Sequence, residues 1–257
     1  MDADTWATLA DLGTAVGTLV LAVATFSSVR SGNRSARVAE RSLLSSQRPL
    51  LMPSRLSDET LKVNFGDNKW VRLPGGSAVA EIGGGDGTRG PRDSVIYLSV
   101  SVRNVGNGIA VLHGWRLTVN ADWPPDAPAP PLSEFQMQTR DLYVSTGDIG
   151  FWQGAIRDLA DDRYPMARQA IENRADWIVD LLYGDQDGGQ RAITRFRCQA
   201  HPWPAHDSGA AGSGAGGSGA GGSGAGGSAA GGSVWLATVA RHWTLDQPDP
   251  RSGDRPE

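Results

Sequence analysis

The chain has almost no cysteine and almost no lysine. Its single cysteine, Cys198, excludes an intramolecular disulfide and suits a reducing compartment. Two of its 24 basic residues are lysines, and so strong a preference for arginine, together with many Gly, Ala and Pro residues, suggests a GC-rich genome.

Catalytic motifs are also missing from the sequence. No nucleophile elbow, phosphate-binding loop, pair of carboxylates or Ser-His-Asp set at interpretable spacing stands out. The sequence therefore predicts no cofactor and favours a protein that is not an enzyme, although an enzyme with dispersed site residues stays open.

Charge is absent from Leu12 to Val29, a run of eighteen residues. At ~1.5 Å rise per residue, a helix of this length covers about 27 Å, close to the ~30 Å hydrocarbon core of a bilayer. We therefore expect an N-terminal tail and transmembrane helix over residues 1–29. A buried or interfacial helix is the alternative. A cleaved signal peptide fits less well, because the preceding residues are acidic rather than basic.

Arginines follow this run directly. Basic flanks stay on the cytoplasmic side, so we expect a single-pass protein of the cell membrane with its N-terminus outside and its C-terminal domain in the cytoplasm. We interpret 30–49 as a basic juxtamembrane helical stalk that ends at Arg48-Pro49, because a residue before proline disfavours helix. The predicted contacts with anionic lipid are Arg30, Arg34, Arg37 and Arg41.

Gly13 and Gly17 form a GxxxG pair in the hydrophobic run. Such a pair lets two helices approach closely in lipid. It predicts helix packing at these glycines and a homodimer through the membrane helix.

The rest of the chain is acidic. Beyond residue 48 there are 19 basic and 24 acidic residues, a formal charge near −5. Nonspecific nucleic-acid binding needs a basic surface, so we expect no nucleic-acid partner.

Alternating apolar residues dominate from residue 50 onward. They predict strands at 96–103 and 109–119, joined as a hairpin by a tight turn at Asn107-Gly108. On the second strand the alternation places His113 on the apolar face with Val111 and Trp115, so a buried histidine is expected.

A second predicted hairpin pairs 177–183 with 191–199 around a turn at 184–189. Arg191, Arg195 and Arg197 share one face of the return strand, which is either wet or paired with acids. Pro165 starts a short helix that runs to about Arg174. Weaker strands are expected near 59–65, 69–72, 77–82 and 135–145.

Residues 208–233 are a Gly/Ser/Ala run with GAGGS repeats, which cannot form a core. The single strand after it cannot fold alone, so we expect 50–207 and 234–251 to form one domain, with the run as a flexible loop insertion and 252–257 as a disordered tail. An engineered linker is the alternative for the run. Many short strands with one small helix predict a mainly β fold, an antiparallel β-sandwich of immunoglobulin-like type, with a partly open barrel as second choice.

Candidate site motifs have simpler explanations. The segment GDGTRG at 85–90 fits a dinucleotide-binding pattern, but a strand follows it where a helix is needed. The segment 185–188 resembles the start of a calcium loop without its closing Glu, which favours a turn. Cys198, His201 and His206 are too few ligands for a structural zinc site and lie beside a flexible loop. The sequence therefore predicts no catalytic, cofactor-binding or metal residues.

Nine tryptophans are many for this length. Most are expected in the core. Trp123, Trp152 and Trp203 lie in predicted loops and form the candidate binding surface.

Three stretches carry a resemblance: RNVGNGIA at 103–110, YGDQDGGQRAITRF at 183–196 and HWTLDQPDPR at 242–251. With the N-terminal helix, they resemble a group of membrane-anchored proteins of actinobacteria such as streptomycetes, whose activity is uncharacterised. The resemblance implies membrane anchoring and a bacterial host, and it assigns no site.

These observations predict a membrane-anchored protein with a cytoplasmic β-sandwich for interaction or sensing, whose ligand is a protein or a small molecule. Two alternatives stay open. One is a membrane-surface enzyme with dispersed residues, for example in 146–163, and the other is an oligomerising membrane effector.

Overall fold

The computed structural model describes residues 3–67, 69–84, 94–119, 127–200 and 233–247, with side chains for all of these except 3–11, 41, 44 and 45. The chain divides into two compact units, Met1–Gln47 and Arg48–Glu257. We call the second unit the β domain.

The first unit is one continuous helix, α1 (Ala3–Ser46). Within the described residues it holds one segment, Leu12–Glu40, that is long and apolar enough to cross a bilayer, and none of that segment is buried. The hydroxyls of Thr18 and Thr25 donate to the carbonyl oxygens of Thr14 and Leu21, each at 2.8 Å. These bonds satisfy polar groups that hydrocarbon could not. The predicted N-terminal apolar helix is confirmed.

The β domain consists mainly of antiparallel strands. Its described strands are β1 (Leu51–Pro53), β2 (Leu61–Asn64), β3 (Trp70–Leu73), β4 (Ser77–Gly83), β5 (Val95–Asn104), β6 (Ala110–Val119), β7 (Gln136–Val144), β8 (Ile149–Ile156), β9 (Trp177–Gly184), β10 (Arg191–Ala200) and β11 (Ser233–Thr244). The described helices of this unit are the short 3-10 helix η1 (Leu132–Glu134) and α2 (Arg163–Glu172). The mainly β class and the second, short helix are confirmed.

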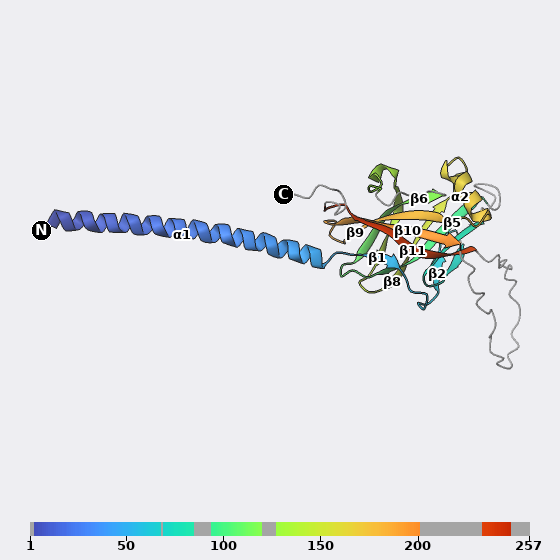
Figure 1. Ribbon diagram of the computed structural model, residues 1–257, viewed down its shortest axis with the longest axis horizontal. Helices are drawn as coiled ribbons and strands as arrows, with labels where there is room; N and C mark the ends of the chain where they lie inside the picture. Colours follow the sequence, from blue (N-terminus) through green and yellow to red (C-terminus); the bar gives the residue numbers. More distant parts are fainter. Residues whose placement is uncertain (1–2, 68, 85–93, 120–126, 201–232, 248–257) are drawn as a thin grey trace, which may run out of the picture. The chain divides into compact units, whose positions relative to one another are not determined.

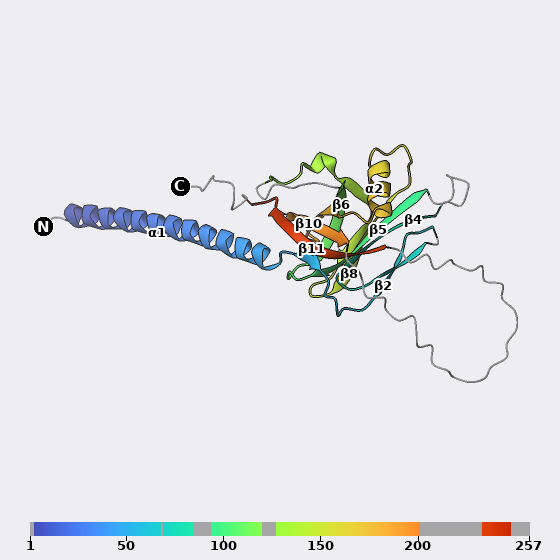
Figure 2. The same cartoon turned by 45° about the vertical axis from the view of Figure 1, so that its right-hand side comes forward.

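Nine strands form a single curled sheet (Figures 1 and 2). They follow the order β1-β5-β4-β11-β10-β9-β6-β7, and β8 pairs with the other side of β5. The last strand, β11, lies between β10 and β4. Because the strands follow one connected path rather than two facing sheets, the immunoglobulin-like sandwich is not confirmed. A partly open barrel, the second choice, describes this path, with β7 and β8 at its two ends.

The inner face of the curled sheet holds the main core. A sheet that curls in this way encloses a space that side chains fill, and large and small residues share it here. Its largest members are Trp115, Trp152, Trp177, Trp235, Tyr183 and Phe196, and its small members include Ala78, Ala80, Ala110, Ala192 and Ala237. The buried face of α2 packs against the same cluster through Tyr164, Ala167 and Ile171.

The predicted hairpin between 96–103 and 109–119 is wrong in its pairing. Both strands exist, but β5 pairs with β1, β4 and β8, whereas β6 pairs with β7 and β9. The connecting loop docks on the start of the domain instead, since Val105 N donates to the Leu50 carbonyl oxygen (2.8 Å) and Asn107 N to that of Arg48 (3.2 Å). The second predicted hairpin, β9 with β10, is confirmed.

His113 lies at a β-bulge, where the register of β6 shifts between Leu112 and Gly114. The extra residue reverses the alternation, so Leu112 and Trp115 both face the core. His113 is half-exposed, and the prediction that it is buried is wrong.

The outer face of the sheet carries two further clusters. The hairpin of β2 and β3 covers part of β4 and β5 with Val63, Phe65, Val71 and Leu73. The second cluster lies on β9 and β10, where Arg195 is buried against Asp180, with Nε–Oδ1 at 2.6 Å and Nη2–Oδ2 at 2.7 Å. Arg116 also donates to Asp180 (3.0 Å). The predicted arginine face of β10 is thus paired with acid at Arg195.

Candidate functional site

The strands β7 and β8 are consecutive in the chain but form no described ladder with each other. Near their connecting turn both strands are held against the end of β5, because Asn104 N donates to the Asp148 carbonyl oxygen (3.1 Å), Gly147 N donates to that of Asn104 (2.9 Å), and Asn104 Nδ2 donates to that of Val144 (3.0 Å). Further along, the side chain of Gln138 crosses between the strands, with Nε2 donating to the Gln153 carbonyl oxygen at 3.2 Å. We call this opening between β7 and β8 the seam.

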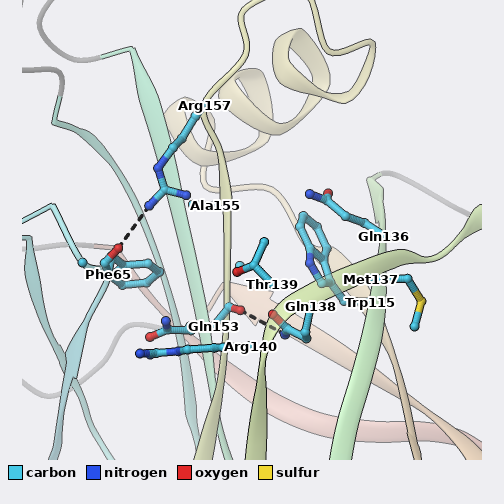
Figure 3. A pocket seen from close by; sticks show the side chains of 12 residues that line it. Phe65, Trp115, Gln136, Met137, Gln138, Thr139, Arg140, Gln153, Ala155 and Arg157 are labelled. Carbon is cyan, nitrogen blue, oxygen red and sulfur yellow. Dashed lines mark hydrogen bonds between the residues drawn. The ribbon is translucent and has the colours of Figure 1, made fainter. Parts of the chain in front are cut away.

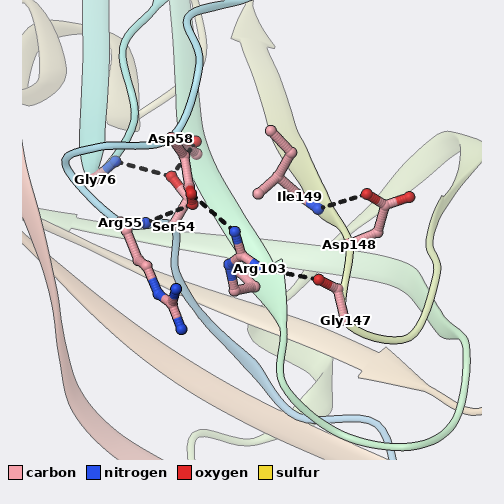
Figure 4. Close-up of polar contacts among 9 residues, drawn as sticks. Ser54, Arg55, Asp58, Gly76, Arg103, Gly147, Asp148 and Ile149 are labelled. Atoms are coloured by element: carbon pink, nitrogen blue, oxygen red, sulfur yellow. Dashed lines mark hydrogen bonds and ion pairs between the residues drawn. The ribbon is translucent and has the colours of Figure 1, made fainter.

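Arg103 of β5 binds the turn that connects β7 and β8, at one end of the seam (Figure 4). Its guanidinium donates to the Gly147 carbonyl oxygen (2.9 Å) and to Asp58 Oδ1 (2.8 Å). Burial alone would raise the pKa of Asp58, but hydrogen bonds from Arg55 N and from Arg103, with the nearby positive charges, lower it below its usual value. Asp58 therefore stays ionised and keeps Arg103 in place.

A pocket of about 210 Å³ opens on the seam (Figure 3). It draws on β6, β7, β8 and the turn after β2, so four separate segments build it. The lining residues are Phe65, Gly66, Trp115, Gln136, Met137, Gln138, Thr139, Arg140, Gln153, Gly154, Ala155 and Arg157. We call it the seam pocket.

Arg140 enters the seam pocket from β7 and is held by a neutral partner. With Gln153 Nε2 donating to the Asn64 carbonyl oxygen (3.1 Å), Gln153 Oε1 accepts a hydrogen bond from Arg140 Nη2 at 2.7 Å. Among the described residues, no carboxylate lies within ion-pair distance of Arg140. Its charge is therefore positioned without being neutralised.

Arg157 supplies the second positive charge. Its Nη2 donates to the Phe65 carbonyl oxygen (3.1 Å) and lies 3.5 Å from Asp67 Oδ2. Asp67 also accepts a hydrogen bond from the Tyr97 hydroxyl (2.8 Å). Burial raises the pKa of Tyr97, and the bond to Asp67 raises it further, so the phenol stays protonated as a donor. The Arg157–Asp67 pair is long and half-exposed, which makes it weak.

Aromatic rings form the apolar wall. Trp115 and Trp152 meet edge to face with their centroids 5.3 Å apart. Gly154 makes this approach feasible, because an added Cβ would lie 2.6 Å from Cζ2 of Trp152 and 3.1 Å from Cε2 of Trp115. The guanidinium of Arg163, on α2, lies 5.2 Å from the Trp115 ring centre and covers it from another side.

Of the three tryptophans predicted as a binding surface, the structure describes one. Trp152 lies on β8 in the core and is fully buried, so its prediction as a surface residue is wrong. Trp123 and Trp203 lie outside the described residues, as do the 85–90 motif, His201, His206 and residues 208–232 of the Gly/Ser/Ala run, whose last residue, Ser233, begins β11.

The helix residues singled out by sequence lie on α1. Added side-chain atoms at Gly13 and Gly17 would meet nothing within 4 Å, which leaves room for a partner helix. Arg30, Arg34 and Arg37 are exposed. The side chain of Arg41 is outside the described set.

Three polar residues have structural roles. Cys198 is fully buried, and burial raises the pKa of its thiol, so the thiolate is disfavoured. Asp185 Oδ1 accepts from Gln190 N (3.0 Å) and so holds the β9–β10 turn. His242 Nδ1 lies 3.0 Å from the Thr194 hydroxyl, which in turn contacts the Tyr183 hydroxyl at 2.9 Å. Burial, helped by Arg48, lowers the pKa of His242.

The seam pocket was not predicted, although β7 carries a trace of it in sequence. The segment QMQTRD at 136–141 is polar at nearly every position, and most of it is exposed. A strand whose side chains are polar on both faces has no apolar layer packed on either face. This pattern is typical of a strand at the edge of a sheet.

Comparison with known proteins adds no analogue. No known protein-family model, curated protein or solved structure matches this chain. The assignment of a function therefore depends on the geometry described above.

Proposed function

We propose that the chain is a single-pass membrane protein, with its N-terminus outside the cell and its β domain acting as a cytoplasmic binding module. The observation that carries this proposal is α1, whose Leu12–Glu40 segment exposes apolar side chains such as Leu19, Leu21 and Phe26 over most of their surface. Water would penalise this exposure at every turn of the helix, whereas hydrocarbon would not.

The arginines support the orientation. Because α1 continues as a helix to Ser46, the positions 30, 34, 37 and 41 recur every three or four residues and share one face. A basic face next to an apolar segment suits the anionic cytoplasmic leaflet.

Protease protection tests this topology in intact cells. A tag at the C-terminus is expected to fractionate with membranes and to resist protease added outside. Replacing the four arginines by glutamine is expected to release or invert the chain, while replacing them by lysine keeps the charge and serves as the matched control. A soluble tag, or one digested from outside, would overturn the proposal.

The seam pocket supports the binding role of the β domain. Binding pockets combine apolar walls with a few placed polar groups, and this one adds two arginines to aromatic walls. An enzyme with residues in 146–163 has less support, since β8 (Ile149–Ile156) occupies the middle of that range and Trp152 is buried.

Self-association through α1 is a second candidate. Small residues recur at Gly13, Gly17 and, one residue after each, Thr14 and Thr18, which lets a second helix approach. Isoleucine at both glycines is expected to reduce the oligomer to a monomer in detergent, whereas isoleucine at Gly32, outside the pair, is expected to have no effect. An unchanged oligomer, or a wild-type monomer, would exclude this candidate.

A further inference from the structure

We propose that the seam pocket binds a small anionic polyol, that is, a monosaccharide carrying a carboxylate or a phosphate. The inference rests on the proposed function, because it gives the binding module its ligand class. It follows from the charge, the hydrogen-bonding groups, the apolar wall and the size of the pocket, taken in turn.

Charge selects an anion. Arg140 and Arg157 line the pocket, and none of its described lining residues is acidic. The β domain as a whole is acidic, so this pair is a local exception that would attract an anion to one place. A guanidinium presents a fork of N–H donors that matches the oxygens of carboxylate and phosphate alike.

Amides and a hydroxyl select a polyol. Gln136, Gln138 and Thr139 lie along β7, opposite Gln153 of β8 (Figure 3). Each amide offers both donors and an acceptor, and the hydroxyl offers both as well. Sugar hydroxyls also donate and accept, so they fit this lining better than an apolar acid would. Phe65 and Trp115 contribute apolar atoms to the lining beside these polar groups.

Size favours one small molecule over a polymer. The pocket volume of about 210 Å³ lies below the range of roughly 300–1,000 Å³ that is typical of sites for drug-sized ligands. The Gln138 side chain, bonded to the Gln153 carbonyl oxygen, closes the seam where an extended peptide would have to pair with the edge of β8. A peptide strand would have to displace this bridge, whereas a monosaccharide would not.

Asp67 acts as a competitor for one arginine. Its carboxylate lies 3.5 Å from Arg157 and is fixed by the Tyr97 hydroxyl. An anionic ligand would draw Arg157 away from this weak pair. Asp67→Asn is therefore expected to strengthen ligand binding a few-fold, the opposite direction to loss of the arginine.

Calorimetry on the full chain in phosphatidylcholine nanodiscs tests the proposal, because zwitterionic lipid does not compete for the arginines. The probes are glucuronate, glucose 6-phosphate and glucose. We expect at least one of the two anions to bind and glucose to bind about tenfold more weakly or not at all, since hydrogen bonds to charged groups are the stronger ones. The two anionic arms tell a carboxylate ligand from a phosphate ligand.

Variants then assign the binding to this pocket. Arg140→Gln and Arg157→Gln are each expected to weaken anion binding about tenfold. Arg72→Gln removes the same charge from the exposed face of β3, away from the pocket lining, and is the matched control with unchanged affinity. Unchanged melting temperatures for the variants would show that the domain remains folded.

Any of three binding patterns would overturn the inference: equal binding of glucose and the anions, anion binding that both arginine variants leave unchanged, or preference for an acidic pentapeptide over both charged sugars. Absence of binding by a folded, membrane-embedded chain would also overturn it while leaving the proposed topology intact. Conversely, a chain that binds the sugar but fractionates as soluble would overturn the topology and keep the ligand.

Discussion

The two units of this chain place charged and apolar side chains in opposite environments. In α1, Leu21 is 68% exposed and Phe26 is 71% exposed, whereas in the β domain Arg195 is 1% exposed and Asp180 is fully buried. Apolar exposure is costly in water, and a buried ion pair is tolerable only with close partners. The comparison teaches that the two units treat apolar side chains differently: α1 leaves them exposed along a segment long enough to cross a bilayer, whereas the β domain buries them in its own core.

The largest expected effect breaks the buried pair in the β domain. Asp180→Asn leaves Arg195 and Arg116 without their shared carboxylate, and we expect a loss of about 3–5 kcal/mol in the free energy of unfolding. Urea unfolding of the full chain in micelles measures it. Asp176→Asn is the matched control, because its pair with Arg197 is about half-exposed and should be worth less than about 1 kcal/mol. Equal losses for the two variants would contradict the burial argument.

The next effect puts a charge into the apolar helix. Leu19→Arg is expected to cost membrane insertion about 3 kcal/mol, because an arginine near the centre of a membrane helix is disfavoured by that amount. The measurement is the fraction of protein that resists alkaline extraction from membranes. Ser31→Arg, among the existing arginines, should leave that fraction unchanged. If Leu19→Arg also leaves it unchanged, α1 does not lie in lipid.

A smaller effect tests the tight packing of aromatic rings in the core of the β domain. Gly154→Ala would press a methyl group against Trp115 and Trp152, and we expect a destabilisation of about 1–3 kcal/mol with a changed near-ultraviolet tryptophan spectrum. Gly189→Ala is the control, since its nearest neighbour would be Asp185 Oδ2 at 3.7 Å. A fully stable variant with an unchanged spectrum would show that the two rings can move apart freely.

Local patterns in the sequence predicted the positions of the strands better than they predicted which strands pair. The alternation of 96–103 and 109–119 identified both strands, but the Asn107-Gly108 signal for a hairpin was overridden by long-range contacts. An added side chain at Gly106 would clash with the backbone of residues 48–50. The conformation of this loop is therefore set by the segment at the start of the β domain that packs against it. Strand β8 was missed because glycines at 150 and 154 interrupt its apolar pattern. Those glycines instead admit Val144 and the two tryptophans.

The candidate site was beyond reach of the sequence for a related reason. Arg140 and Arg157 are seventeen positions apart, and Phe65 is further away still. They come together because β7 and β8 do not pair along the seam and because the β2–β3 hairpin covers the outer face of the sheet. The polar residues of β7 indicate only an edge strand, and which strands pair beside it has no local signature. By contrast, the N-terminal apolar helix was predictable because its signal, eighteen consecutive uncharged residues, is local.

The smallest expected effect is the pH dependence of stability that comes from His242, a partly buried residue of β11. Burial, with a contribution from Arg48, lowers the pKa of His242 in the folded chain below its ordinary value near 6.5. The unfolded chain then binds more protons than the folded chain once the pH falls below that value, so stability is full above about pH 6.5 and declines on acidification. Thermal melting between pH 7.5 and 5 measures the decline. His242→Gln keeps a polar group near Thr194 and should flatten the part of the profile that begins near pH 6.5. A wild-type profile that rises with acidification, or one that the variant reproduces in full, would show that His242 does not carry this pH dependence.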